Sequence, residues 1–116
     1  MPFDERPLNR RALPRRLVED ATEIYGRDVV VDWCEGLLAG SIADDDPHRP
    51  DISWLGGTTG WKAYWSRTWG ARGLVYCGPP ARPEIVIAAL QDEHPRVRAM
   101  AARVVTRFAL SSEASD

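Results

Sequence analysis

A short acidic cluster near the middle of the chain is the first candidate for chemistry. Asp44, Asp45, Asp46 and Asp51, together with His48, carry oxygen and imidazole groups of the kind that bind divalent cations. Their spacing does not match an EF-hand calcium loop, because no glycine stands at the sixth position and no glutamate at the twelfth. We therefore expect these side chains to serve turns and caps, and we predict no metal site.

The remaining nucleophiles and bases form no catalytic pattern. His94 precedes a proline in what reads as a turn, and neither histidine of the chain neighbours a Ser or Cys in a nucleophile motif. Cys34 and Cys77 lie in apolar segments without a nearby histidine, so we expect two buried reduced thiols rather than a disulfide or a zinc site. No glycine-rich phosphate loop is present. We predict no catalytic residue and no cofactor.

Bulk composition narrows the class of protein. The chain has 116 residues, of which 44% are hydrophobic and 28% charged, and this favours one packed globular domain over disorder. The net charge of -2 gives no general attraction to DNA or membranes, so such a partner would need a local basic patch. No apolar run is long enough to span a membrane, and the first residues lack a signal-peptide core. We expect a cytoplasmic protein.

Apolar residues recur every three or four positions, which predicts an all-α domain over residues 1–116. Prolines near predicted helix starts and glycines near predicted ends set the boundaries. The expected helices cover residues 13–25, 28–39, 60–77, 83–90 and 95–110. The expected divisions are an arm over 1–12 docked through Phe3 and Leu8, a two-helix N-terminal cap over 13–40, an irregular loop over 41–59, stacked helices over 60–110, and a frayed tail over 111–116.

A weak internal repeat with a period of 31 residues runs through the second half of the chain. Arg67 aligns with Arg98, and Arg72 aligns with Arg103. A repeat of this length usually marks stacked supersecondary units rather than a closed enzyme fold. We therefore expect two similar helical hairpins lying side by side.

The downstream copy resembles a HEAT repeat of the short bacterial kind. The matching residues are an apolar first helix (Ile85, Val86, Ala89, Leu90), the turn Asp92-Glu93-His94-Pro95, and the pairs Val97-Arg98 and Ala101-Ala102. The resemblance covers residues 83–108 and implies a short α-α superhelix with a binding role. In that family the turn aspartate and the arginine six residues on form a ladder between neighbouring repeats. The resemblance therefore assigns Asp92 and Arg98 to such a ladder.

The upstream copy, over residues 52–77, is degenerate. Arg67 and Ala71 match, but Trp61 stands where the ladder aspartate belongs. Gly56 and Gly57 stand where a first helix belongs.

Helical-wheel positions divide the 60–77 helix into two faces. Small residues such as Gly70 and Gly73 share one face and predict close packing against a neighbouring helix. Trp61, Trp65 and Trp69 follow one another at four-residue intervals on the other face. In the repeat register this second face continues onto the 95–110 helix. We call the combined surface the aromatic–arginine face, and its members are Trp65, Trp69, Arg72, Tyr76, Arg96, Met100, Arg103 and Arg107.

Two interpretations of the aromatic–arginine face remain open. Tryptophans carry a large apolar area, so the stripe can simply be buried core. If part of it is exposed, aromatic and basic groups together suit an acidic peptide or single-stranded nucleic acid. We expect a non-catalytic protein-interaction module of unknown partner, with self-association possible, and we keep the nucleic-acid or acidic-ligand binder as the alternative.

An enzymatic alternative follows from the resemblance alone, because some DNA glycosylases and lyases are built from HEAT-like repeats. Trp65, Trp69 and Arg72 would line such a site, with Asp51 or Asp32 as the carboxylate. No specific motif of those enzymes is present in the chain.

Overall fold

The computed structural model describes residue 3 and residues 5–110, and within them every regular element is helical. The elements are α1 (Pro14–Tyr25), α2 (Arg27–Ala39), the 3₁₀ helix η1 (Ile52–Leu55), α3 (Ala63–Cys77), α4 (Pro83–Ala89) and α5 (Pro95–Phe108). The all-α prediction is confirmed for this part of the chain. None of the described helices is both long and apolar enough to cross a membrane. The expected tail over 111–116 lies outside the described residues.

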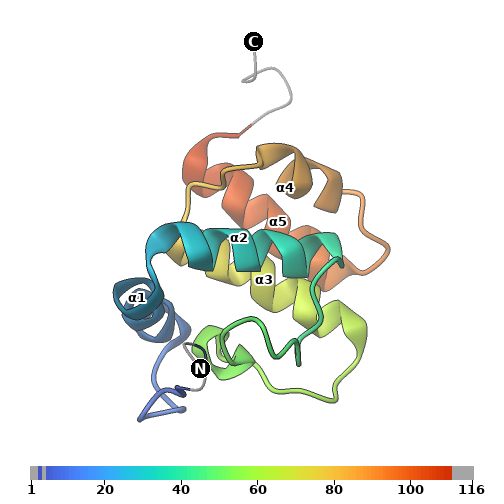
Figure 1. Ribbon diagram of the computed structural model, residues 1–116. Coiled ribbons are helices and arrows are strands. Elements are labelled where there is room, and N and C mark those ends of the chain that lie inside the picture. The colour runs from blue at the N-terminus through green and yellow to red at the C-terminus, as the bar shows by residue number, and fades with distance from the viewer. Residues whose placement is uncertain (1–2, 4, 111–116) are drawn as a thin grey trace.

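Four of the helices form two packed pairs. α2 packs extensively on α3, α4 packs on α5, and the pairs meet where α2 contacts α4 and α3 contacts α5. In Figure 1, α2 lies in front of α3 across the middle of the molecule, with α4 and α5 above them. The expected two-helix cap is therefore divided: α2 belongs to the central pairs, and only α1 lies at one end, against α2, α3 and η1.

A single glycine joins α1 to α2. Pro14 occupies the first turn of α1, where its missing N–H costs nothing, and Leu17, Val18 and Ala21 bury one stripe. Gly26 ends α1 and starts α2 with φ +93°, a value that favours glycine. Because the chain turns at this one residue, α2 begins at Arg27, one residue before the expected start at residue 28.

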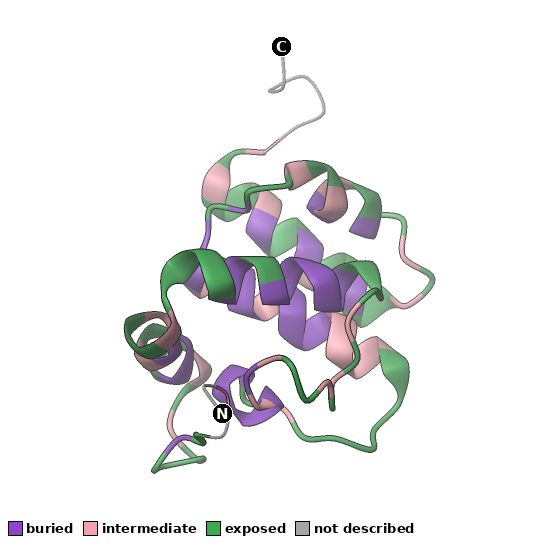
Figure 2. Ribbon diagram, viewed as in Figure 1, coloured by how far each residue is buried: buried purple, intermediate pink, exposed green. Residues whose placement is uncertain are grey.

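The contact between α2 and α3 depends on small residues, as the sequence predicts. A Cβ added at Gly70 would lie 2.6 Å from the main-chain oxygen of Cys34, and one at Gly73 would lie 2.5 Å from the Cys34 Sγ. Figure 2 shows the buried residues of α2 and α3 concentrated where the two helices meet. Cys34 and Cys77 are both free thiols in this core. The close approach of the two backbones leaves no room for larger side chains.

The start of α3 differs from the prediction. Gly60 adopts φ +85° and Lys62 is extended, so α3 begins at Ala63 rather than at residue 60. Lys62 stands at the cap position, and no side chain caps the helix there. Trp61 therefore precedes the helix instead of forming its first turn.

The acidic loop supplies local hydrogen bonds, as expected. Asp51 caps η1 by accepting a hydrogen bond from the Ser53 amide at 3.1 Å, and Asp46 accepts one from the His48 amide at 2.8 Å. All four residues of η1 are buried. The loop therefore contributes both turns and core.

The N-terminal arm docks differently from the prediction. Leu8 is fully exposed, so its predicted docking role is wrong. Pro7 is buried instead, and the carbonyl oxygen of Glu5 accepts a hydrogen bond from the Trp54 indole at 3.1 Å. The Phe3 ring contacts Tyr25 with centroids 5.4 Å apart, which supports the other predicted anchor.

Candidate ligand-binding face

The three tryptophans around the start of α3 form a graded cluster. Trp69 is only 4% exposed and contacts the Gly57 backbone, Trp65 is half-buried, and Trp61 is 56% exposed. Their ring centroids lie 5.6–5.9 Å apart, within the range of favourable aromatic pairs. The cluster is therefore buried in the core at Trp69 and exposed at the surface at Trp61.

Contacts between α3 and α5 follow the predicted repeat register at the start of the face. The Arg96 guanidinium lies over the Trp65 ring at 5.0 Å from its centroid, a cation–π distance. One residue before Trp65, the Tyr64 ring stacks on His94 with centroids 3.6 Å apart. His94 also caps α5, because its Nδ1 accepts a hydrogen bond from the Arg96 amide. His94 is therefore a turn residue, as predicted.

Arg72 is a half-buried cation with incomplete compensation. It donates one hydrogen bond, from Nη2 to the Leu55 carbonyl oxygen at 2.8 Å, and its Nε is buried without a hydrogen-bond partner in the described structure. Burial lowers the pKa of Arg72, nearby Tyr76 partly offsets this, and the like charge of Arg103 lowers it further. Arg72 therefore links α3 to η1 through the Leu55 carbonyl oxygen, with its Nε left unsatisfied among the described residues.

An open groove runs beside these residues between α3 and α5. Its volume is about 400 Å³, and its lining residues are Val75, Ala99, Ala102, Arg103, Thr106 and Arg107. Arg103 and Arg107 are exposed, and Tyr76 and Met100 are half-buried against the core. Arg107 lies over the Phe108 ring at 5.3 Å, and Arg103 Nη1 lies 3.6 Å from Met100 Sδ. The groove has small side chains along its floor and cations at its edge.

Most arginines outside this face pair with carboxylates, although Arg11, Arg27 and Arg98 have no such partner among the described residues. Arg15, Arg16, Arg49, Arg67 and Arg82 each pair with a carboxylate within 3.2 Å. In contrast, the structure gives no carboxylate partner, among its described residues, to the face arginines Arg72, Arg96, Arg103 and Arg107. Positive charge on this face is therefore uncompensated within residues 5–110.

The ladder predicted from the repeat uses a different arginine. Arg67 of α3 donates two hydrogen bonds to the Asp92 carboxylate, at 2.8 and 3.2 Å, and links α3 to the turn before α5. The Arg98 side chain instead donates to the main-chain oxygen of Asp92 at 2.7 Å. Asp92 thus joins the two helical pairs, whereas Arg98 contacts only its own turn.

The Asp92 pair also has a predictable pH dependence. Burial alone would raise the pKa of Asp92, but hydrogen bonds from the Arg67 guanidinium and the His94 amide outweigh it and hold the pKa below the ordinary value. A carboxyl with a lowered folded-state pKa stabilises the fold above its unfolded pKa of about 4, and this contribution is lost as the pH falls through the folded-state value.

Asp92→Asn should therefore lower the free energy of unfolding by about 1–3 kcal/mol near neutral pH, since the Arg67 side chain is only 19% exposed and keeps only the exposed Glu93, 3.8 Å away, as a counter-charge. The difference from the unmodified chain should shrink below about pH 4, as Asp92 itself becomes protonated. Urea unfolding followed by tryptophan fluorescence measures both values. The exposed Asp45→Asn is the matched control, and an equal loss in that variant would contradict the assignment.

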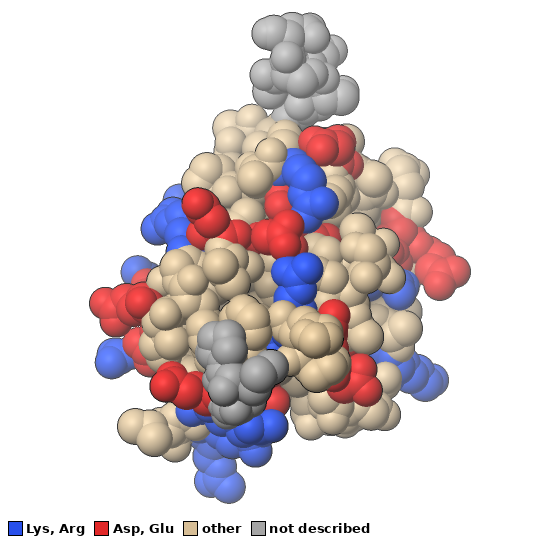
Figure 3. Space-filling view, viewed as in Figure 1, with Lys and Arg blue, Asp and Glu red and all other residues tan. Residues whose placement is uncertain are grey.

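The buried carboxylate of Glu35 was not predicted by the sequence analysis. Glu35 of α2 is only 1% exposed and accepts hydrogen bonds from the Arg82 amide at 2.5 Å and the Arg82 Nε at 3.2 Å. Asp32 pairs with both Arg82 and Arg49. Figure 3 shows acidic and basic side chains alternating over the middle of the molecule, where α2 lies in Figure 1. These charges compensate one another and tie α2 to the segment before α4.

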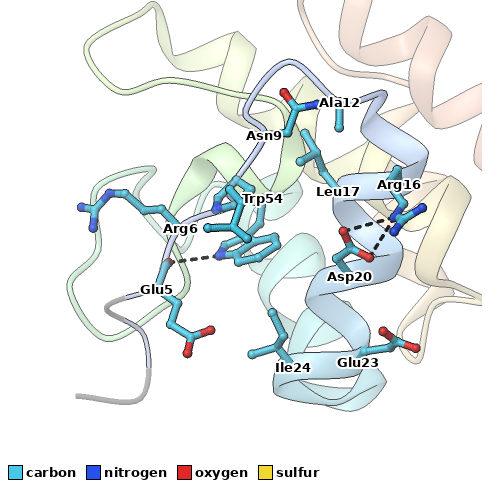
Figure 4. Close-up of a pocket in the computed structure, with 12 residues that line it drawn as sticks. Glu5, Arg6, Asn9, Ala12, Arg16, Leu17, Asp20, Glu23, Ile24 and Trp54 are labelled. Atoms are coloured by element: carbon cyan, nitrogen blue, oxygen red, sulfur yellow. Dashed lines mark hydrogen bonds and ion pairs between the residues drawn. The ribbon is translucent and has the colours of Figure 1, made fainter.

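A second hollow, of about 750 Å³, lies between the arm and α1. Figure 4 shows Trp54 between the arm and the side chains of Leu17 and Ile24, with Arg16 bound to Asp20 at its edge. Sequence reasoning missed this hollow, because it depends on where the arm docks. None of the aromatic–arginine residues lines it.

The described residues offer no other site with obvious chemistry. They contain no group of three or more His, Cys, Asp or Glu side chains placed to hold a metal ion. A hydrogen bond with Cys77 and burial raise the pKa of Cys34, so its thiolate is disfavoured. Asp51 pairs with Arg6 and Arg10, and Asp32 pairs with Arg49 and Arg82. Both carboxylates considered for a glycosylase-like site therefore already form ion pairs within the protein.

Comparisons with protein-family models, with curated proteins and with solved structures find no match for this chain.

Proposed function

We propose that this chain is a non-catalytic protein-interaction module that binds its partner through the aromatic–arginine face. The observation that carries the proposal is the set of face arginines without carboxylate partners in the described residues, beside the open α3/α5 groove. Arginine, methionine and aromatic residues, which make up this face, are enriched in protein–protein interfaces.

The proposed scaffold is a short stack of two HEAT-like hairpins. In this proposal α2 packs against α3 in the place that the repeat register gave to residues 52–59, which form a loop and η1 instead, and α4 with α5 forms the second pair. The Arg67–Asp92 pair supports this reading, because it joins the second helix of one hairpin to the turn of the next. Stacked units of this kind usually present binding surfaces.

Single-stranded nucleic acid is less well supported as the ligand. Nucleobases bind by stacking on free aromatic faces. Here Tyr64 is stacked on His94, Trp65 carries Arg96, and Trp69 is buried, so only Trp61 remains largely exposed. The rings serve the packing of the protein more than they offer platforms for bases.

Selection from a random-peptide display library tests the function without a known partner. The protein should yield specific peptide ligands, and Ala102→Trp should weaken their binding by about tenfold or more, because a large side chain fills the groove. The matched control is Ala88→Trp on α4, which is also an exposed helical alanine but does not line the groove.

Circular dichroism should show the same helical content in both variants. The proposal is wrong if no ligand emerges, or if Ala88→Trp weakens binding as much as Ala102→Trp does.

A further inference from the structure

We infer that the partner segment seated in the α3/α5 groove is an acidic stretch of protein, whose carboxylates meet Arg103 and Arg107. This inference rests on the proposed function and names the chemistry of the partner at the same surface.

Charge is the first argument. Arg103 and Arg107 both line the groove, one helical turn apart on α5. Neither arginine has a carboxylate partner among the described residues. A carboxylate placed beside them would compensate their charges.

Shape is the second argument. The floor of the groove consists of Val75, Ala99 and Ala102, whose short side chains let a second backbone approach closely. Ala99 and Ala102 are exposed, so this floor is accessible from solvent. A segment that alternates carboxylates with small apolar side chains would match both the cationic edge and the apolar floor.

The character of the anion follows from the surroundings. Carboxylates on a peptide bring apolar side chains that can cover the alanine floor, whereas a nucleic acid gains most from stacking on rings that are occupied in this protein. The net charge of -2 adds no general attraction for a phosphate backbone. The groove therefore favours an acidic protein segment over an oligonucleotide.

Fluorescence anisotropy with defined probes tests the inference. The probe is a fluorescein-labelled peptide of repeated Glu-Glu-Leu-Ala, about 14 residues long, which as a helix spans α5. It should bind at least about tenfold more tightly than the same peptide with Gln in place of Glu. Its binding should weaken as salt rises, because the contacts are exposed ion pairs.

The variant Arg103→Gln/Arg107→Gln should weaken binding of the acidic probe by about five- to twentyfold, since each exposed ion pair contributes about two- to fivefold. The control Arg98→Gln removes an equally exposed cation of the same helix that does not line the groove, and it should change binding by less than about twofold.

Three outcomes would overturn the inference: no binding of the acidic probe, equal binding of its Gln counterpart, or equal loss in the double variant and the control. Tighter binding of an oligothymidylate of matched charge would also overturn it, in favour of a nucleic-acid ligand. Library-selected peptides that need the groove but lack acidic residues would leave the proposed function standing while this inference fails.

Discussion

Gly70→Ala should lower the free energy of unfolding by about 2–3 kcal/mol, although alanine is the better helix former. The added methyl group would lie 2.6 Å from the Cys34 carbonyl oxygen and 3.0 Å from the Leu38 nitrogen, and both atoms belong to the backbone of α2. Neither can move unless α2 and α3 separate, which loosens the largest helix contact of the molecule. Urea unfolding with circular dichroism measures the loss.

Gly36→Ala provides the matched control. Its methyl group would meet the Cδ1 and Cγ1 atoms of Ile42, which is a half-buried side chain of the loop that can rotate away. The gain in helix propensity, about 1 kcal/mol, should offset most of the rearrangement. A Gly70 variant that unfolds no more easily than the Gly36 variant would show that α2 and α3 tolerate separation.

Trp69→Ala should be the most destabilising single truncation in the aromatic cluster, at about 3–5 kcal/mol. The side chain is 4% exposed and fills the space between α3 and Gly57, so its removal leaves a cavity that the loop backbone cannot fill. A domain of this size usually has about 5–15 kcal/mol of stability, so the variant would keep only a fraction of it. Thermal and urea unfolding measure the effect.

Trp61→Ala measures the cost of the same truncation at the exposed end of the cluster. Trp61 is 56% exposed and precedes α3, so its truncation should cost less than about 1.5 kcal/mol. Comparable losses at Trp61 and Trp69 would contradict the graded burial of the cluster.

Helices with strong local signals could be predicted from the sequence. α4 and α5 begin at prolines, and α1 combines Pro14 with one apolar stripe, so their positions follow from capping and periodicity. The close packing of one face of α3 could also be predicted, because Gly70 and Gly73 destabilise an isolated helix and are favourable only where a neighbouring helix packs closely against them.

Long-range partners could not be predicted, and they determine the details of the site. Glu35 reads as a surface residue in its helical wheel, yet Arg82 from a distant segment buries it. The resemblance assigned Asp92 and Arg98 to a ladder, whereas the structure pairs Asp92 with Arg67 of α3 and places Arg98 on a carbonyl oxygen of its own turn. The local sequence pattern also does not predict that the rings of Tyr64 and His94 stack on each other.

The position of Arg98 has a consequence for the charge on the surface of α5. Arg98 stands in α5 where Arg67 stands in α3, yet its guanidinium reaches only a carbonyl oxygen of its own turn. Its charge therefore has no carboxylate partner among the described residues, and a carboxylate brought to it from outside would gain only an exposed ion pair, worth about 0–1 kcal/mol.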